Sequence, residues 1–168
     1  MKVAITDASV FFDLYKIELL PEFFGLDIEI YTTDFIFNEI LQSDERSLFE
    51  TFCRSNKLKI IVIDETEREK ISEMNLCFGN KSLADRTAIF KAKQMDCILL
   101  TCDKKLTKEA KRQGIEVHGS IWIVCQLLEN KKLEPDIAID RLELLKETNS
   151  WLPLEAINNV INNLKGLR

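Results

Sequence analysis

The chain has 168 residues, of which 46% are hydrophobic and 30% are charged, and its formal net charge is −5 at pH 7. This length is typical of one domain, because a chain of about 150 residues can bury roughly 70% of the surface that it exposes when unfolded. The composition excludes a disordered or fibrous chain, and the net acidity argues against a protein that holds nucleic acid by bulk charge alone.

Short stretches rich in β-branched residues alternate with stretches of helical periodicity. In chain order the prediction is strand 2–6, helix 8–20, strand 28–33, helix 34–42, helix 47–56, strand 58–63, helix 65–75, helix 82–94, strand 97–101, helix 104–114 and strand 115–119. Strands that alternate with helices indicate a parallel sheet that is covered on both faces. The sequence therefore predicts an α/β fold.

After Ser120 the pattern becomes entirely helical. Three helices are predicted at residues 121–133, 134–147 and 153–166, with Pro135 and Pro153 near the starts of the last two. No linker-like composition separates these helices from the rest of the chain. We expect residues 1–132 to form the α/β domain and residues 133–168 to form a helical extension packed on it.

The location and redox state of the chain follow from simple patterns. The first apolar run is short and is interrupted by Asp7, so it lacks the apolar core of a signal peptide, and no run of about 18 apolar residues occurs. We expect a cytoplasmic protein without a membrane span. The cysteines are odd in number and lack zinc-site spacing, so we expect buried reduced thiols. They are Cys53, Cys77, Cys97, Cys102 and Cys125.

Four acidic residues stand where a parallel sheet would bring them together. Asp7 follows the first predicted strand, and Asp103 follows strand 97–101 by two residues. Glu39 lies on the helix after the second strand, and Asp85 lies in the first turn of the helix before the fourth strand. The carboxyl ends of parallel strands meet at one edge of the sheet, where such folds bind ligands. Asp85 reaches that edge only if the segment before its helix crosses over the sheet.

Clustered carboxylates repel one another, and such a cluster persists when a cation neutralises it. Oxygen ligands suit Mg²⁺ or Mn²⁺. A bound divalent ion lowers the pKa of its water and stabilises the oxygens of a phosphodiester during displacement. The four acids therefore favour metal-assisted hydrolysis of a phosphodiester.

Each acid also has a purely structural explanation. Ser82 and Asp85 fit a capping-box pattern, and Asp7 and Asp103 precede helices as N-cap residues do. Glu39 would then be a solvated residue beside an apolar stripe. For any one acid the structural explanation is the better one, whereas the ordered set of four favours a shared site.

The segments ITDAS, FNEI, SLADRTAIFKA and LLTCDKKL, in this order, resemble the PIN-domain family over roughly residues 1–128. The resemblance implies an α/β/α sandwich with a central parallel sheet and a ribonuclease activity that depends on Mg²⁺ or Mn²⁺. It implies that the catalytic and metal-binding residues are Asp7, Glu39, Asp85 and Asp103, with Ser9 and Thr101 as supporting hydroxyls. Many small members of the family are toxins that an antitoxin protein inhibits, while the helical tail after Lys132 resembles that of longer members.

A basic helix face is the candidate RNA contact. Lys104, Lys108, Lys111 and Arg112 are spaced i, i+4, i+7 and i+8, so they line one side of a helix. Solvated cations near a helix C-terminus give the same pattern. His118 is the single histidine, which excludes cleavage of RNA by a histidine pair.

A Rossmann enzyme is excluded, because no GxGxxG turn follows the first strand. A P-loop NTPase is excluded as well, because no GxxxxGK[ST] loop occurs. The sequence therefore predicts a divalent-metal-dependent endoribonuclease with RNA as substrate, of the kind found as toxins. The alternative is a PIN-like protein that binds RNA or a protein partner without cleavage. Self-association into a homodimer through the tail helices is a third possibility.

Overall fold

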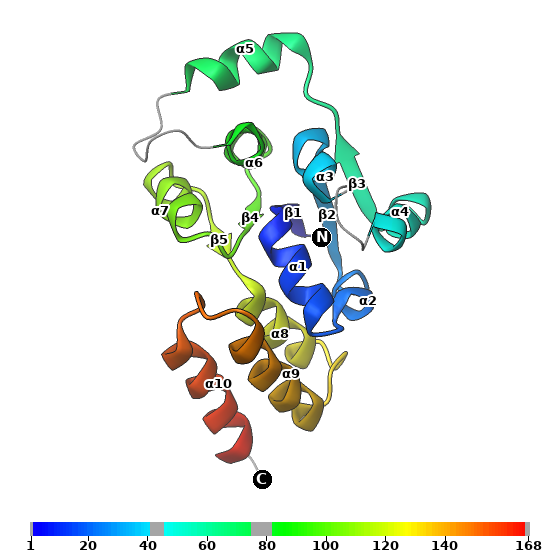
Figure 1. Ribbon diagram of the computed structural model, residues 1–168, viewed down its shortest axis with the longest axis vertical. Coiled ribbons are helices and arrows are strands. Elements are labelled where there is room, and N and C mark those ends of the chain that lie inside the picture. Colours follow the sequence, from blue (N-terminus) through cyan, green and yellow to red (C-terminus); the bar gives the residue numbers. More distant parts are fainter. Residues whose placement is uncertain (1, 41–45, 75–81, 167–168) are drawn as a thin grey trace. The chain divides into compact units, whose positions relative to one another are not determined.

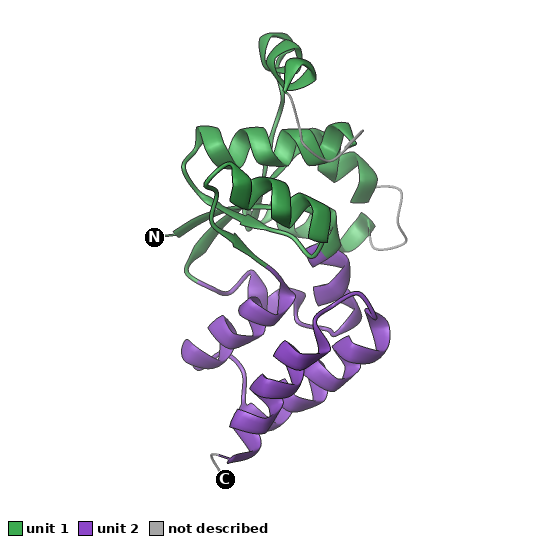
Figure 2. Ribbon diagram, turned by 90° about the vertical axis from the view of Figure 1, so that its left-hand side faces the viewer, with its two compact units in different colours: residues 1–9, 27–118 green, residues 10–26, 119–168 purple. Residues whose placement is uncertain are grey.

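The computed structural model describes residues 2–40, 46–74 and 82–166. The chain divides into two compact units, shown in Figure 2, of residues 1–9 with 27–118 and residues 10–26 with 119–168. The first unit carries a β-sheet and all four predicted acids, and the second is helical. The boundaries of these units do not test the predicted domain boundary after residue 132, which stays a prediction.

The first unit is built on a sheet of five parallel strands (Figure 1). The strands β1 (Lys2–Thr6), β2 (Ile28–Thr33), β3 (Leu58–Ile61), β4 (Ile98–Leu100) and β5 (Val117–His118) lie in the order β3-β2-β1-β4-β5. Strand β1 is therefore central, and the chain continues to opposite sides of it for β2 and β4. Such a reversal of strand order is where open α/β sheets place their ligands, at the carboxyl ends of the strands.

The described helices of the first unit are α3 (Asp34–Ile40), α4 (Arg46–Arg54), α5 (Glu65–Glu73), α6 (Leu83–Gln94) and α7 (Lys104–Arg112). Helix α6 packs on β1, β2, β4 and α3, and its buried face carries small residues such as Ala84, Ala88 and Ala92, which permit close approach to the sheet. Helix α5 follows β3 and packs on α6 (Figure 1).

The second unit contains most of α1 (Ala8–Lys16), with α2 (Leu20–Phe23), α8 (Ser120–Glu129), α9 (Pro135–Thr148) and α10 (Leu154–Gly166). Helix α9 packs against both α8 and α10. The rings of Phe11, Phe23 and Phe24 contact one another, with centroids 5.2 to 6.5 Å apart. These buried rings are part of the apolar core of this unit.

A buried carboxylate also ties helices of the second unit together. Asp13 on α1 is only 4% exposed. Its Oδ2 atom accepts a hydrogen bond from the Ser120 hydroxyl at 3.0 Å, and the Asn149 amide nitrogen lies 2.9 and 3.1 Å from its two oxygens. These donors are needed because burial of a carboxylate without hydrogen-bond partners costs on the order of several kcal/mol of folding free energy. Asp13 thus connects α1 to the start of α8 and the end of α9.

The predicted fold class, an α/β/α sandwich with a central parallel sheet and C-terminal helices, is confirmed. The predicted helix 8–20 is wrong in one respect, because α1 ends at Lys16 and α2 starts at Leu20. Glu18 takes a φ of 55°, and the Leu19 N–H reaches back to the Leu14 carbonyl oxygen at 2.9 Å. This is a Schellman-type helix end, which more often carries glycine.

Two further expectations concern cysteines and membranes. Cys53, Cys97, Cys102 and Cys125 are each partly rather than fully buried. Cys77 lies outside the described residues, as do Leu41, Gln42 and Asn75 at the ends of predicted helices. Among the described helices, none is both long and apolar enough to cross a bilayer.

Candidate functional site

Asp7 lies at the carboxyl end of the central strand. Its backbone N–H donates to the Leu100 carbonyl oxygen at 2.9 Å, which extends the pairing of β1 with β4. The Thr101 N–H donates to the His118 carbonyl oxygen at 2.9 Å in the same way, between β4 and β5. Asp7 and Thr101 therefore end neighbouring strands at the point where the strand order reverses. The Asp7 side chain is buried there, at 7% exposure.

Two hydroxyl groups hold one oxygen of this carboxylate. Ser9 Oγ and Thr101 Oγ1 donate to Asp7 Oδ2 at 2.7 and 2.9 Å. The same hydroxyl oxygens accept the backbone N–H groups of Cys102 and Asp103, at 3.0 and 3.1 Å. The Ala8 N–H donates to Asp7 Oδ1 at 2.8 Å. We call Ser9 and Thr101 the hydroxyl cradle. It fixes the orientation of the Asp7 carboxylate from the first turn of α1 and from the segment that follows β4.

The cradle only partly offsets the cost of burying this charge. Burial raises the pKa of Asp7, the hydrogen bonds from Ser9 and Thr101 lower it, and the negative charge of Asp85 raises it further, so that the net direction is upward. Carboxylates that are desolvated beside like charges are held in the protonated form to higher pH. In the metal-free chain, the ionised form of Asp7 is therefore less favourable than that of an ordinary aspartate.

Glu39 belongs to the same electrostatic group. It is exposed on α3, yet the pKa of its carboxyl is raised, first because protein atoms displace part of its water and then because of the charges of Asp7 and Asp85. Within the described ranges, no lysine or arginine forms an ion pair with Asp7 or Glu39. The structure thus brings three of the four predicted acids near one another.

Asp85 reaches this group from the first turn of α6. Its backbone N–H donates to Ser82 Oγ at 3.1 Å, so Ser82 is the N-cap of the helix and the serine half of the predicted capping box is present. The Asp85 side chain is partly exposed. Its charge acts on both Asp7 and Glu39, which shows that the start of α6 lies at the acidic edge.

Asp103 has a different environment from the other three acids. Its Oδ1 atom accepts the Leu106 N–H, so Asp103 is the N-cap of α7, as the structural alternative expects. Its own N–H donates to Thr101 in the cradle. The structure therefore places the backbone of Asp103 beside the site while one side-chain oxygen serves the helix.

The acids suit a hydrated divalent cation better than a closed metal cage. In the part of the chain that the structure describes, no three Asp, Glu, His or Cys side chains are close enough to ligate one ion together. Mg²⁺ keeps several of its waters and is often held by only one or two carboxylates. A fixed, buried Asp7 with two acidic neighbours fits such binding in both ligand chemistry and charge.

The predicted basic face lies on α7, the helix that Asp103 caps. Lys104, Lys108 and Lys111 are exposed. Arg112 is different, because its guanidinium Nε and Nη2 atoms donate to Glu109, a carboxylate with no exposed surface. Sequence reasoning missed Glu109, although its position three residues before Arg112 is a known spacing for helix ion pairs. Contact of Arg112 with a phosphate would therefore have to compete with this ion pair.

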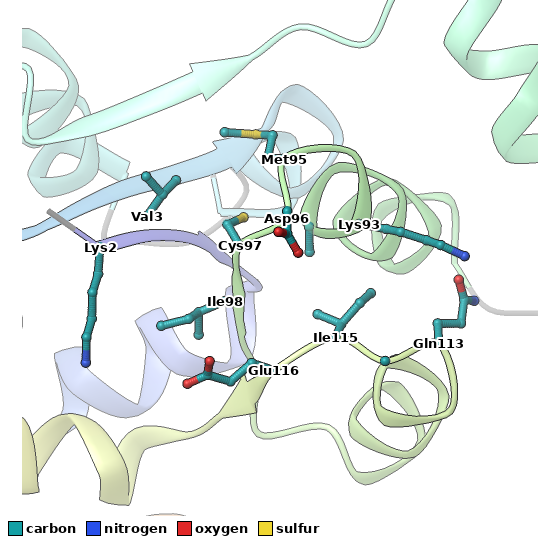
Figure 3. Close-up of a pocket in the computed structure, with 12 residues that line it drawn as sticks. Lys2, Val3, Lys93, Met95, Asp96, Cys97, Ile98, Gln113, Ile115 and Glu116 are labelled. Atoms are coloured by element: carbon teal, nitrogen blue, oxygen red, sulfur yellow. The ribbon is translucent and has the colours of Figure 1, made fainter.

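A cavity of about 860 Å³ opens at the other edge of the sheet (Figure 3). Its wall includes Lys2 at the start of β1, Cys97 just before β4 and Glu116 just before β5. These positions are the amino ends of the strands, whereas Asp7 and Thr101 follow the carboxyl ends. The cavity includes none of the four acids, so the acidic site is a separate feature.

Comparisons with known proteins add the following. A family model described as a PIN domain matches residues 3–166. A solved PilT N-terminus domain protein from the archaeon Sulfolobus solfataricus P2 is similar, with a TM-score of 0.54 and 18% identity over 76% of this chain and 94% of that chain. A domain of a functionally unknown protein from Methanocaldococcus jannaschii DSM 2661 has a TM-score of 0.47 and 24% identity over 71% of this chain and 91% of that one. No curated protein matches this chain.

Proposed function

Because the chain belongs to the PIN-domain family, whose members are generally nucleases, we propose that it is a divalent-metal-dependent endoribonuclease. The observation that carries the proposal is the buried Asp7 carboxylate. It is oriented by the Ser9 and Thr101 hydroxyls and lies within the electrostatic reach of Glu39 and Asp85. A helix cap alone would explain neither the burial nor the neighbouring like charges.

Each residue has a distinct task under this proposal. Asp7, Glu39 and Asp85 would hold Mg²⁺ or Mn²⁺, and Asp103, whose backbone is tied to the cradle, would complete the acidic set. Such an ion, when bound, supplies an activated water and offsets charge on the phosphate. In the metal-free chain, partial burial and the charges of Asp7 and Asp85 raise the pKa of Glu39, and a bound cation would offset those charges.

The reaction would be hydrolysis of the phosphodiester. The water oxygen bonds to phosphorus, the bond from phosphorus to the 3′ oxygen breaks, and the products carry a 3′-hydroxyl and a 5′-phosphate. The exposed lysines of α7 would orient the RNA, because the helix starts at Asp103 and presents Lys104 and Lys108 next to that end. Lysine contacts with phosphates give affinity without sequence readout.

One observation favours a second candidate. No three potential ligands among the described residues stand at ligating distance, which would suit a PIN-like protein that binds RNA or a protein partner without cleavage. A protein partner of this kind would cover the acids with its own cations, whereas a toxin inhibited by an antitoxin would belong to the first candidate and would cleave RNA when alone. Activity measured with the chain alone separates the two candidates.

The test uses 5′-labelled single-stranded RNA and tRNA with purified protein and Mn²⁺. We expect fragments with 5′-phosphate and 3′-hydroxyl ends, and complete loss of cleavage when EDTA removes the metal. Asp140→Asn removes one carboxylate charge at an exposed position of α9. It is the control for a change of net charge and should cleave like wild type. Intact RNA at large enzyme excess would overturn the proposal. Ends with a 2′,3′-cyclic phosphate would overturn the hydrolytic mechanism.

A further inference from the structure

Two threonines that the sequence patterns do not single out meet behind the acidic site. Thr33 ends β2, and Thr87 lies on α6, 54 residues later in the chain. Both have no exposed surface, and their hydroxyl oxygens are 2.7 Å apart. A hydrogen bond between two buried side chains from distant segments is uncommon, since most side-chain hydrogen bonds go to the backbone or to water.

The direction of each hydrogen bond in this pair follows from counting protons. Thr87 Oγ1 donates its one proton to the Ala84 carbonyl oxygen at 2.7 Å. The proton between the two hydroxyls must therefore come from Thr33, which donates to Thr87. Thr33 Oγ1 in turn accepts the Ile36 N–H at 3.3 Å. The result is one continuous chain of hydrogen bonds, from the first turn of α3 through two hydroxyls to the first turn of α6.

This chain ends on the peptide group that carries Asp85. The Ala84 carbonyl belongs to the same peptide unit as the Asp85 N–H, and Ser82 Oγ accepts that N–H at 3.1 Å. Hydrogen bonds therefore hold both sides of this peptide unit. At the other end of this series of hydrogen bonds, Thr33 Oγ1 accepts the Ile36 N–H in the first turn of α3, the helix that carries Glu39. The two acids contributed by helices are thus joined through buried hydroxyls.

We propose that the Thr33–Thr87 link is a positioning device that fixes Asp85 relative to Glu39 and so sets the affinity of the acidic site for its cation. The inference rests on the proposed function. Apolar side chains of similar volume would pack α6 against α3 without the need to satisfy buried hydroxyls. Directional hydrogen bonds also fix the position of one helix relative to the other. Removal of groups that orient metal ligands commonly changes metal affinity about 10- to 100-fold.

The experiment compares Mn²⁺ titrations of wild type, Thr87→Val and Thr87→Ser, each checked for folding by circular dichroism. Valine keeps the shape and loses the hydroxyl, so we expect Mn²⁺ binding to weaken about 10-fold or more. Serine keeps the hydroxyl and should restore binding close to wild type. Ser120→Ala removes a buried hydroxyl from the Asp13 network in the second unit and serves as the control for lost stability alone. Its Mn²⁺ affinity should match that of wild type.

A second readout needs no metal. In the metal-free protein, amide hydrogen exchange of Ile36 and Asp85 should speed up in Thr87→Val and remain slow in Thr87→Ser and Ser120→Ala. If wild type binds no Mn²⁺, the proposed function fails, and these exchange rates alone decide whether the link positions the two helices. If Thr87→Val does not fold, Thr33→Val takes its place. Unchanged Mn²⁺ affinity in a folded variant that lacks the link would overturn the inference, as would unchanged exchange at both amides.

Discussion

Asp7→Asn should abolish RNA cleavage and at the same time raise the melting temperature of the metal-free protein. Cleavage should fall on the order of 10³-fold or more, as expected when one member of a catalytic set is removed. Asparagine has nearly the same shape: its Oδ1 can still accept the Ala8 N–H, and its Nδ2 can donate to the cradle hydroxyl oxygens once their protons turn away from it, so the fold should persist. The opposite signs of the two effects distinguish a functional carboxylate from a structural cap.

The sign of the stability effect follows from the raised pKa of Asp7. Between the ordinary pKa of aspartate and the raised value, the folded chain binds more protons than the unfolded chain, so stability falls as pH rises through that window, and the loss persists at higher pH. Asparagine does not ionise and escapes this loss. Each pKa unit corresponds to about 1.4 kcal/mol, and each kcal/mol shifts the melting temperature by about 2–4 °C for a chain of this size.

Differential scanning calorimetry near neutral pH, with metal removed by a chelator, measures this shift. Asp140→Asn is again the control, because its carboxylate is exposed and its loss should leave the melting temperature nearly unchanged. A melting temperature of Asp7→Asn below that of wild type would mean that the carboxylate stabilises the fold, and the structural explanation would then be the better one.

Metal binding should strengthen as pH rises. The pKa values of Asp7 and Glu39 are both raised, so protons compete with the metal for these carboxylates over a wider range of pH than for ordinary acids. The affinity for Mn²⁺ should be weakest in acid and should increase until pH exceeds both raised values, after which it should level off. Titrations at several values from about pH 5 to about pH 8 measure this dependence. An affinity that does not change with pH would show that neither carboxylate binds the ion.

The fold could be predicted from the sequence where the local pattern and the tertiary packing agree. The β-branched runs at residues 2–6 and 28–33 match β1 and β2 residue for residue, and each strand is followed directly by a polar residue, Asp7 or Asp34. Strands β3, β4 and β5 are shorter than their apolar runs. An apolar run continues past a strand when its side chains pack beyond the last ladder pair, as buried Ile63 does after β3.

The acidic site was accessible only in part. The carboxyl-edge rule predicts that Asp7 and the loop after β4 are neighbours, and the backbone hydrogen bond from Asp7 to Leu100 fits that expectation. It could not predict that Asp103 serves a helix N-terminus with one oxygen, because a cap and a ligand look alike in sequence. The Thr33–Thr87 contact was also hidden, since a threonine at the end of a strand and another inside a helix have no spacing that links them.

The most direct measurement is a calorimetric titration of Mn²⁺ into wild type and into Asp7→Asn, Glu39→Gln and Asp85→Asn, with Asp140→Asn as the exposed control. We expect binding to wild type and to the control, and much weaker binding in each of the three folded variants, because each variant removes a ligand or a neighbouring negative charge from one shared site. If wild type binds no Mn²⁺, or if all three variants bind it as wild type does, the acids do not form a metal site and the ribonuclease proposal is wrong.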